Sequence, residues 1–303
     1  MVKVSLHLGA HKTASTHLER MLRQNVSAHG FSEIRVAKKR DIRDAITSKL
    51  DQVKHKEELS PELIAGVTKL LRRKSTIVVS DENILGTTTS LFEKDQFYPN
   101  AERRMRRVKR LLAGYDVTVF LAIRNPADFI TSSYCEAVRH SGYIPFEDYV
   151  DGDDLKKMRW SNLVRRISKA APGVKICLWQ FEYYPTIWRQ VSERMLNVGK
   201  QRAGQIEWLD EVARPGMSAK ALKEFKRLRG TELTREQADD ILFDNPRSRW
   251  NGTPDLFTRA QRQSLNKRFQ RDLAELTHID NVEFIGPLKA PMQATSWLKR
   301  RFG

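Results

Sequence analysis

The sequence predicts an α/β fold, a three-layer sandwich with a central, mainly parallel sheet and a helical C-terminal part. Three observations support this prediction. Apolar stretches of strand length alternate with longer amphipathic stretches over the first half of the chain, the apolar stretches are bounded by polar or turn residues, and beyond about residue 185 only helical spacing recurs. Strands that alternate with helices are typical of a parallel sheet covered by helices on both faces.

Four strands are expected. Residues 2–8 alternate apolar and polar side chains, residues 76–79 are a short β-branched run, residues 117–123 are continuously apolar, and residues 174–179 form a further strand. The strict alternation of residues 2–8 is typical of a half-exposed strand, whereas a central parallel strand is usually apolar throughout. Both interpretations of this first strand stay open.

Helices are expected between and after these strands. Apolar side chains recur at helical spacing in residues 17–24, and residues 101–112 carry an apolar stripe opposite many arginines. Asn125 and Pro126 suit the start of another helix. The other expected helices are residues 40–54, 61–73, 155–170, 219–229, 235–243 and 259–277. We expect a single domain, 1–303, with a core at 1–188 and a helical extension at 200–303.

The composition excludes several classes of protein. Hydrophobic residues make up 40% and charged residues 30% of the chain, which excludes collagen-like, low-complexity and coiled-coil sequences. Cys135 and Cys177 are too few for a disulfide framework, and we expect reduced thiols. No apolar run approaches the ~20 residues of a membrane helix, and the first residues do not resemble a signal peptide. The sequence therefore predicts a cytoplasmic protein.

The charge balance is unusual. Lys and Arg number 54 against 37 Asp and Glu, which gives a net charge of +17. Such a charge favours a polyanionic partner, although a soluble protein can also be basic without one.

A loop suited to binding an anion follows the first strand. Residues 9–16 read Gly-Ala-His-Lys-Thr-Ala-Ser-Thr and lead into a helix. A strand, a tight turn and a helix N-terminus direct several backbone N–H groups at one point, where Lys12 and the hydroxyls of Thr13, Ser15 and Thr16 would join them. The alternative is a helix cap in which Thr16 and Glu19 form a capping box.

This loop is not a Walker A loop. That motif places a glycine directly before the lysine, and His11 stands there in this chain. Residues 76–81 would nevertheless pass for a Walker B strand. A P-loop-like kinase or NTPase therefore stays as an alternative.

A second element begins at Arg124, which ends a strand, and continues through Asn125 and Pro126 to Ser132. Arg124 and Ser132, two helical turns apart, are placed to converge on a second phosphate. The alternative is that Arg124 only pairs with Asp128.

Together the two elements resemble those of the sulfotransferases that use 3′-phosphoadenosine 5′-phosphosulfate (PAPS). His11-Lys-Thr-Ala-Ser-Thr16 is similar to the 5′-phosphosulfate loop, and Arg124-Asn-Pro126 followed by Ser132 is similar to the 3′-phosphate element. The order, the separation and the strand context match. The similarity extends to about residue 188, more faintly to 257–276, and is greatest to the bacterial carbohydrate-type branch.

The resemblance implies a P-loop-like fold with residues 1–188 as the cofactor-binding core. Lys12 would contact the bridging or sulfuryl oxygens, and Thr13, Ala14, Ser15 and Thr16 would cradle the 5′-phosphate. His11 would also belong to the cofactor-binding residues. Arg124 and Ser132 would bind the 3′-phosphate. Ala14 stands where the family usually has glycine, which is costly if that position needs a positive φ.

The reaction implied is in-line transfer of a sulfuryl group from PAPS to an acceptor hydroxyl, which relies on positioning and charge stabilisation. The family commonly uses a Glu or His to take the acceptor's proton. Glu82, directly after the second strand, is our candidate, and Asp81 is the alternative because adjacent side chains at a strand end point to opposite faces.

The acceptor implied is a polysaccharide or glycolipid, and an acidic acceptor would account for the excess positive charge. Arg103, Arg107 and Arg110 form the basic face expected to bind it, and Arg247 and Arg249 are placed to cover the cofactor. No metal is expected, because His7, His11 and His17 match no metal-binding pattern. No nucleic acid partner is expected. A third function class, a non-catalytic polyanion-binding protein, also fits the charge.

Overall fold

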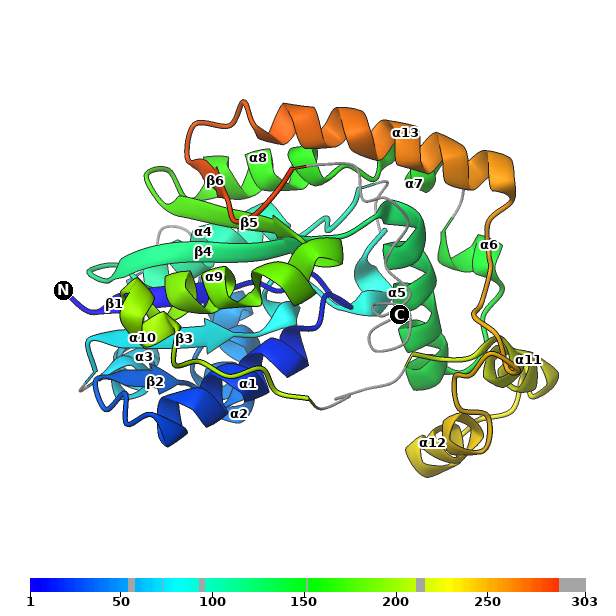
Figure 1. The fold of residues 1–303 in the computed structure, drawn as a ribbon, viewed down its shortest axis with the longest axis horizontal. Coiled ribbons are helices and arrows are strands. Elements are labelled where there is room, and N and C mark those ends of the chain that lie inside the picture. Colours follow the sequence, from blue (N-terminus) through cyan, green and yellow to red (C-terminus); the bar gives the residue numbers. More distant parts are fainter. Residues whose placement is uncertain (54–57, 73, 93–95, 151, 211–215, 289–303) are drawn as a thin grey trace.

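A computed structural model describes residues 1–53, 58–72, 74–92, 96–150, 152–210 and 216–288. Within these ranges six parallel strands form one sheet in the order β2-β3-β1-β4-β5-β6 (Figure 1). The strands are β1 (Lys3–His7), β2 (Ile34–Val36), β3 (Thr76–Ser80), β4 (Asp116–Ile123), β5 (Lys175–Gln180) and β6 (Val282–Phe284). The predicted α/β class with a parallel central sheet is confirmed.

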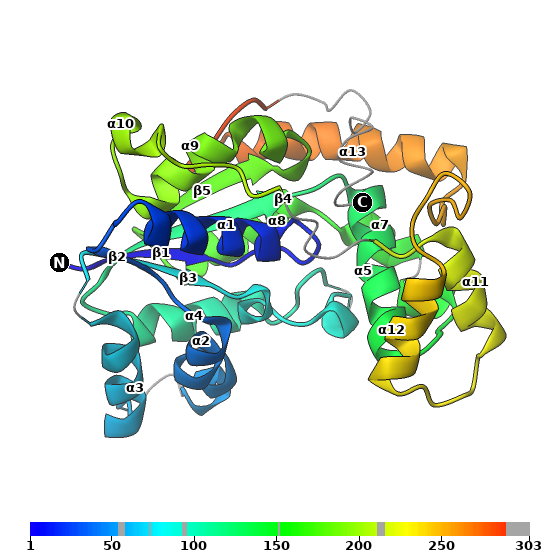
Figure 2. The same cartoon turned by 60° about the horizontal axis from the view of Figure 1, so that its bottom comes forward.

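Helices cover both faces of this sheet. One face packs against α1 (Ser15–Ala28) and α9 (Tyr184–Leu196), and the other against α4 (Ala101–Leu111), α8 (Trp160–Ala170) and α13 (Arg259–Leu276). Figure 2 shows α1 on one side of β3 and α4 on the other. The three layers match the prediction.

The first strand is buried on both faces, so the interpretation as a half-exposed strand is wrong. Val4 and Leu6 enter one apolar core, while the alternate polar side chains are equally buried. Ser5 Oγ donates to Met195 O at 2.6 Å, and His7 Nδ1 lies 2.9 Å from Ser80 Oγ. Specific hydrogen bonds thus allow polar side chains inside a central strand, since they replace the bonds to water.

Strands β2 and β6 were not predicted. Each has three residues and lies at an edge of the sheet. Three residues are too few to show the alternation of a strand in the sequence. Backbone pairing places both strands in the sheet, β2 beside β3 and β6 beside β5.

The chain after α9 returns to the sheet. It passes through α10 (Lys200–Ala203), α11 (Ala219–Arg227) and α12 (Arg235–Asp244) before α13. Helices α11 and α12 pack on α5 (Pro126–Ser141) through an apolar cluster that includes Tyr134, Phe225 and Ala238. The described part of the predicted helical extension thus packs beside α5 and includes an edge strand, β6 (Figure 1).

Four further helices connect these elements: α2 (Lys39–Ala45), α3 (Pro61–Leu71), α6 (Phe146–Tyr149) and α7 (Gly152–Lys157). Short 3₁₀ turns include η2 (Glu82–Ile84) and η5 (Phe181–Tyr183). Across the described ranges, no helix combines the length and the apolar character needed to cross a bilayer.

Candidate functional site

The carboxyl ends of the six parallel strands lie along one edge of the sheet. The helix after β1 covers one face, whereas the helices after β3 and β4 cover the other. Where the connections diverge in this way, here beside β1, parallel α/β sheets bind ligands in the crevice at the carboxyl ends of the strands.

The loop after β1 has an unusual backbone. Lys12 has φ 61° and Ala14 has φ 60°, both in the left-handed region that favours glycine. Ala14 is the residue before α1 and gives it no side-chain cap. Strained residues of this kind are typical of functional loops, and such turns direct successive N–H groups at an anion.

The alternative capping box is wrong. Helix α1 begins at Ser15, so Thr16 lies inside the first turn instead of at the cap. Glu19 accepts a bond from Arg23 at 2.8 Å. The first N–H groups of α1 therefore stay available to a ligand, since the geometry of a helix gives them no partner within it.

Two side chains brace this loop. Thr13 Oγ1 donates to Ala10 O at 2.6 Å, and Arg124 Nη1 donates to Lys12 O at 2.6 Å. The second bond joins the two elements that the sequence singled out. Since Arg124 is buried, it holds the carbonyl of a left-handed residue in place.

His11 belongs to the frame of the loop. Its Nδ1 lies 2.8 Å from Tyr98 Oη and its Nε2 lies 3.2 Å from Asn83 Oδ1. Burial lowers the pKa of His11, against the opposing effects of Glu82, Asn83 and Asp81. A neutral imidazole with both nitrogens engaged fixes the start of the loop.

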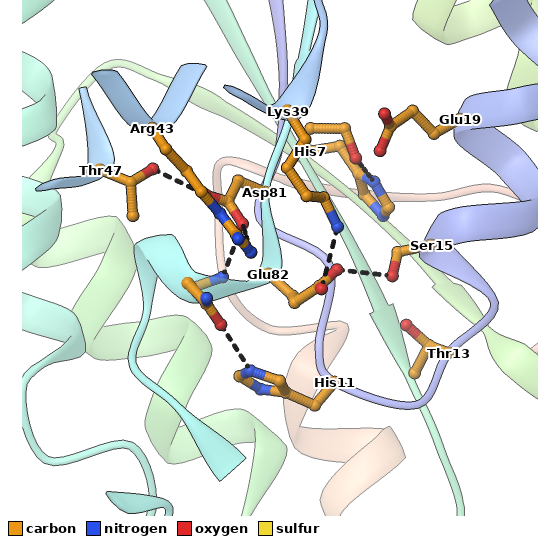
Figure 3. A network of polar contacts seen from close by, with 12 residues as sticks. His7, His11, Thr13, Ser15, Glu19, Lys39, Arg43, Thr47, Asp81 and Glu82 are labelled. Carbon is orange, nitrogen blue, oxygen red and sulfur yellow. Dashed lines mark hydrogen bonds and ion pairs between the residues drawn. The ribbon is translucent and has the colours of Figure 1, made fainter. Parts of the chain in front are cut away.

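Glu82 lies against the start of α1 (Figure 3). Ser15 Oγ donates to its Oε2 at 2.9 Å, and Lys39 Nζ donates to its Oε1 at 3.0 Å. Burial alone would raise the pKa of Glu82, but the charge of Lys39 and the hydrogen bonds from Lys39 and Ser15 lower it to about 2. The carboxylate is thus ionised and in contact with the loop.

Asp81 points away from the loop, toward α2 and the turn that follows it (Figure 3). It is fully buried, and its Oδ2 accepts from Thr47 Oγ1 at 2.8 Å and from Arg43 Nε at 3.3 Å. Its Oδ1 accepts from the N–H of Asn83. These bonds give Asp81 a structural role and leave Glu82 as the acid that faces the loop.

Lys12 reaches α5. Its Nζ lies 3.1 Å from Glu136 Oε2, and His140 Nε2 lies 3.2 Å from Glu136 Oε1. Burial would raise the pKa of Glu136, but Lys12 and the basic side chains near it lower it to about 2. The ammonium that was expected to meet an anion thus contacts a carboxylate of the chain itself.

The remaining predicted anion ligands lie around the same crevice. Thr16 is half-buried at the start of α1, and Ser132 is half-buried in the second turn of α5. Arg124 donates a hydrogen bond to Lys12 O and interacts with Asp128 through its charge, so it does more than pair with Asp128, whose carboxylate accepts from Arg262 at 2.9 Å. Arg247 is close enough for its charge to interact with Arg124.

The basic face of α4 is partly neutralised. Arg107 Nη1 donates to Asp51 Oδ1 at 2.5 Å, and Arg103 Nη2 donates to Asn100 Oδ1 at 3.0 Å. Arg110 lies near the other end of the helix. Because α4 runs back from the carboxyl edge to the start of β4, these arginines extend away from the loop, and their role toward an acceptor stays a prediction.

Three residues of this edge were missed in the sequence. Lys39 follows the unpredicted strand β2, Glu136 lies four residues after Ser132 on the same helix, and Glu182 follows β5. The spacing from Ser132 could have indicated Glu136, since positions i and i+4 share a helix face. The described residues contain no group of His, Cys, Asp and Glu suited to a metal.

Comparison with solved structures finds a similar fold. No protein-family model and no curated protein matches the chain. Among solved structures, the chain is similar to a sulfotransferase from Alicyclobacillus acidocaldarius, with a TM-score of 0.45 and 15% sequence identity over 90% of this chain and 93% of that chain. The function proposed below rests on the residues at the sheet edge.

Proposed function

We propose that this protein is a sulfotransferase that moves a sulfuryl group from PAPS to a hydroxyl of a carbohydrate-type acceptor. The observation that carries the proposal is the bond from Arg124 to Lys12 O. It places the two elements that resemble the 5′-phosphosulfate loop and the 3′-phosphate element in direct contact. A donor with phosphates at both ends of one nucleoside fits such a pair.

Backbone N–H groups at the start of α1, with Ser15 and Thr16, would hold the 5′-phosphate. Arg124 and Ser132 would hold the 3′-phosphate. Lys12 would leave Glu136 and contact the bridging or sulfuryl oxygens, where it would stabilise the negative charge that develops on the bridging oxygen as its bond to sulfur breaks. The bond from sulfur to the acceptor oxygen forms on the opposite side, and 3′-phosphoadenosine 5′-phosphate leaves.

Glu82 would take the proton of the acceptor hydroxyl. Its low pKa makes it a weak base, but the hydroxyl becomes strongly acidic as its oxygen bonds to sulfur. Ser15 links this carboxylate to the loop, so the base and the bound donor share one rigid frame.

The alternative NTPase finds less support at the end of β3. A Walker B carboxylate must be free to act on a metal ion or its water, whereas Asp81 is buried and bonded to Arg43, Thr47 and Asn83. The excess of basic residues stays compatible with a protein that only binds polyanions.

A thermal-shift screen tests the proposal, because a ligand that binds the native state raises the melting temperature. We expect 3′-phosphoadenosine 5′-phosphate to stabilise the protein more than AMP, ADP or ATP does, without magnesium. Stabilisation by Mg·ATP alone would favour the kinase or NTPase, and equal small shifts with all four nucleotides would favour the polyanion-binding protein.

A further inference from the structure

Glu182 is a buried acid that the proposed reaction does not use. It follows β5, in the turn η5, with 9% of its surface exposed. Its Oε1 accepts a hydrogen bond from the backbone N–H of Asn125 at 2.6 Å. Its Oε2 is buried and has no hydrogen-bond partner among the described residues. A buried carboxylate oxygen without a hydrogen-bond partner is costly. The site therefore favours a bound group that forms a hydrogen bond with Oε2.

The neighbouring charges come from several elements. The Arg124 guanidinium lies over the ring of Phe181, 4.6 Å from its centroid, and so beside the residue that precedes Glu182. Asp128, on α5, is the nearby acid, and it is bonded to Arg262 of α13. Arg247 interacts with both Arg124 and Asp128. The carboxyl of Glu182 therefore lies next to the cation proposed to hold a phosphate, without a hydrogen bond to it.

The protonation of this carboxyl follows from its surroundings. Burial raises the pKa of Glu182 to about 7, although the N–H of Asn125 and the charge of Arg124 oppose the shift and Asp128 adds to it. Since Oε1 already accepts a hydrogen bond, the proton belongs on Oε2. The resulting O–H is a buried donor next to Arg124 that lacks an acceptor among the described residues.

We propose that Glu182 is a further binding residue, whose protonated carboxyl donates its Oε2–H to the phosphate held by Arg124. This inference rests on the proposed function, which places a phosphate at Arg124. A phosphate dianion beside an ionised Glu182 would be repelled, whereas a carboxylic acid supplies a hydrogen bond and no charge. Above neutral pH, binding therefore takes up one proton from solvent, and no covalent bond changes.

Titration calorimetry with 3′-phosphoadenosine 5′-phosphate at pH 8.5, in two buffers of different ionisation enthalpy, tests this inference. At this pH the phosphates of the probe are fully ionised, because their second pKa is about 6. We expect the uptake of about one proton per nucleotide bound, and affinity that weakens about tenfold per pH unit above 7. Glu182→Gln keeps a donor in place, so it should bind with little proton uptake and a flat pH dependence.

A matched control is Glu283→Gln. Glu283 lies on β6 and is ion-paired with Lys175 and Arg194, so this variant should take up the proton as the parent does. Binding by the parent that prefers the bisphosphate over AMP but takes up no proton would overturn this inference and leave the proposed function standing. Equal binding of the bisphosphate and AMP would overturn both. The parent protein alone decides either outcome, whether or not the variants fold.

Discussion

Two acids at the same sheet edge, one after β3 and one after β5, have pKa values shifted in opposite directions. After β3, Glu82 is bonded by Lys39 and Ser15, and these groups lower its pKa to about 2. After β5, Glu182 receives one backbone hydrogen bond, and burial raises its pKa to about 7. Both side chains are largely buried, so the difference comes from their partners.

The difference assigns different tasks to the two acids. An ionised carboxylate in contact with the anion loop can accept a proton, whereas a carboxyl that stays protonated near neutral pH can donate a hydrogen bond to an anion. Environments that push two similar groups apart in pKa are typical of sites that need both forms. The proposed reaction places the acceptor hydroxyl at the first acid and the 3′-phosphate at the second.

The largest expected effect is on the β3 side. Glu82→Gln should lower turnover by roughly 10²–10⁴, as the loss of a general base does, and leave affinity for the bisphosphate nearly unchanged. Turnover with PAPS and binding by calorimetry are the measurements. Asp81→Asn is the matched variant, and we expect it to destabilise the fold through its bonds to Arg43 and Thr47. An inactive but folded Asp81→Asn beside an active Glu82→Gln would reverse the assignment.

Lys12 follows β1, which lies between β3 and β5 in the sheet. Its replacement tests charge stabilisation apart from the proton transfer assigned to Glu82. Lys12→Ala should lower turnover by roughly 10²–10³, the usual effect of losing one stabiliser of transition-state charge. Lys39→Ala is the matched lysine variant. Because Lys39 lowers the pKa of Glu82, its loss should move the acid limb of the pH–rate profile upward, and Lys12→Ala should not. A shifted limb in Lys12→Ala instead would contradict this division of roles.

Stability should depend on pH with opposite sign at the two acids. The pKa of Glu182 is raised, so its contribution is full below its ordinary pKa of 4.5 and is lost as the pH rises through about 7. The pKa of Glu82 is lowered, so its contribution is present above 4.5 and is lost as the pH falls toward 2. Each shift corresponds to about 3 kcal/mol at most.

Denaturant unfolding between pH 4 and pH 8 measures the first of these contributions. Relative to the parent protein, Glu182→Gln should gain stability as the pH rises through 7. A constant difference across that range would mean that Glu182 ionises like an exposed acid.

The smallest expected effect concerns α4. Reversing Arg103, Arg107 and Arg110 to Glu should raise the KM of an acidic acceptor at low salt and leave PAPS binding intact. Because Arg107 already pairs with Asp51, we expect a smaller change than three free arginines would give. Added salt should reduce the difference, since surface charges are screened within about 10 Å at 0.1 M. Normal handling of the acceptor at low salt would make this helix face a solvated surface only.

The sequence predicted the sheet edge better than the sheet itself. Arg124 stands directly after a continuously apolar run, and the loop from Gly9 to Thr16 follows a stretch with the period of a strand, so period and turn residues place both without any tertiary information. Strands β2 and β6 were missed because three residues carry no period. The buried polar side chains of β1 misled the prediction because their hydrogen-bond partners, Met195 O and Ser80, are far away in sequence.

The roles of the acids at the site could likewise be predicted only in part from the sequence. Glu82 could be proposed from its place after β3, but its separation from Asp81 needed the positions of Arg43 and Lys39. The ordinary sequence context of Glu182 reveals neither its burial nor the unpaired oxygen. Such properties arise from packing between distant segments, here the start of α5 against the turn after β5.

The affinity of the protein for 3′-phosphoadenosine 5′-phosphate relative to AMP tests the central claim most directly. If Arg124 and Ser132 hold a 3′-phosphate, the bisphosphate should bind well over tenfold more tightly, about 1.5–3 kcal/mol for one set of charge-assisted contacts. Arg124→Ala should erase that preference. Equal affinity for the two nucleotides in the parent protein would contradict the assignment of this sheet edge to a sulfotransferase.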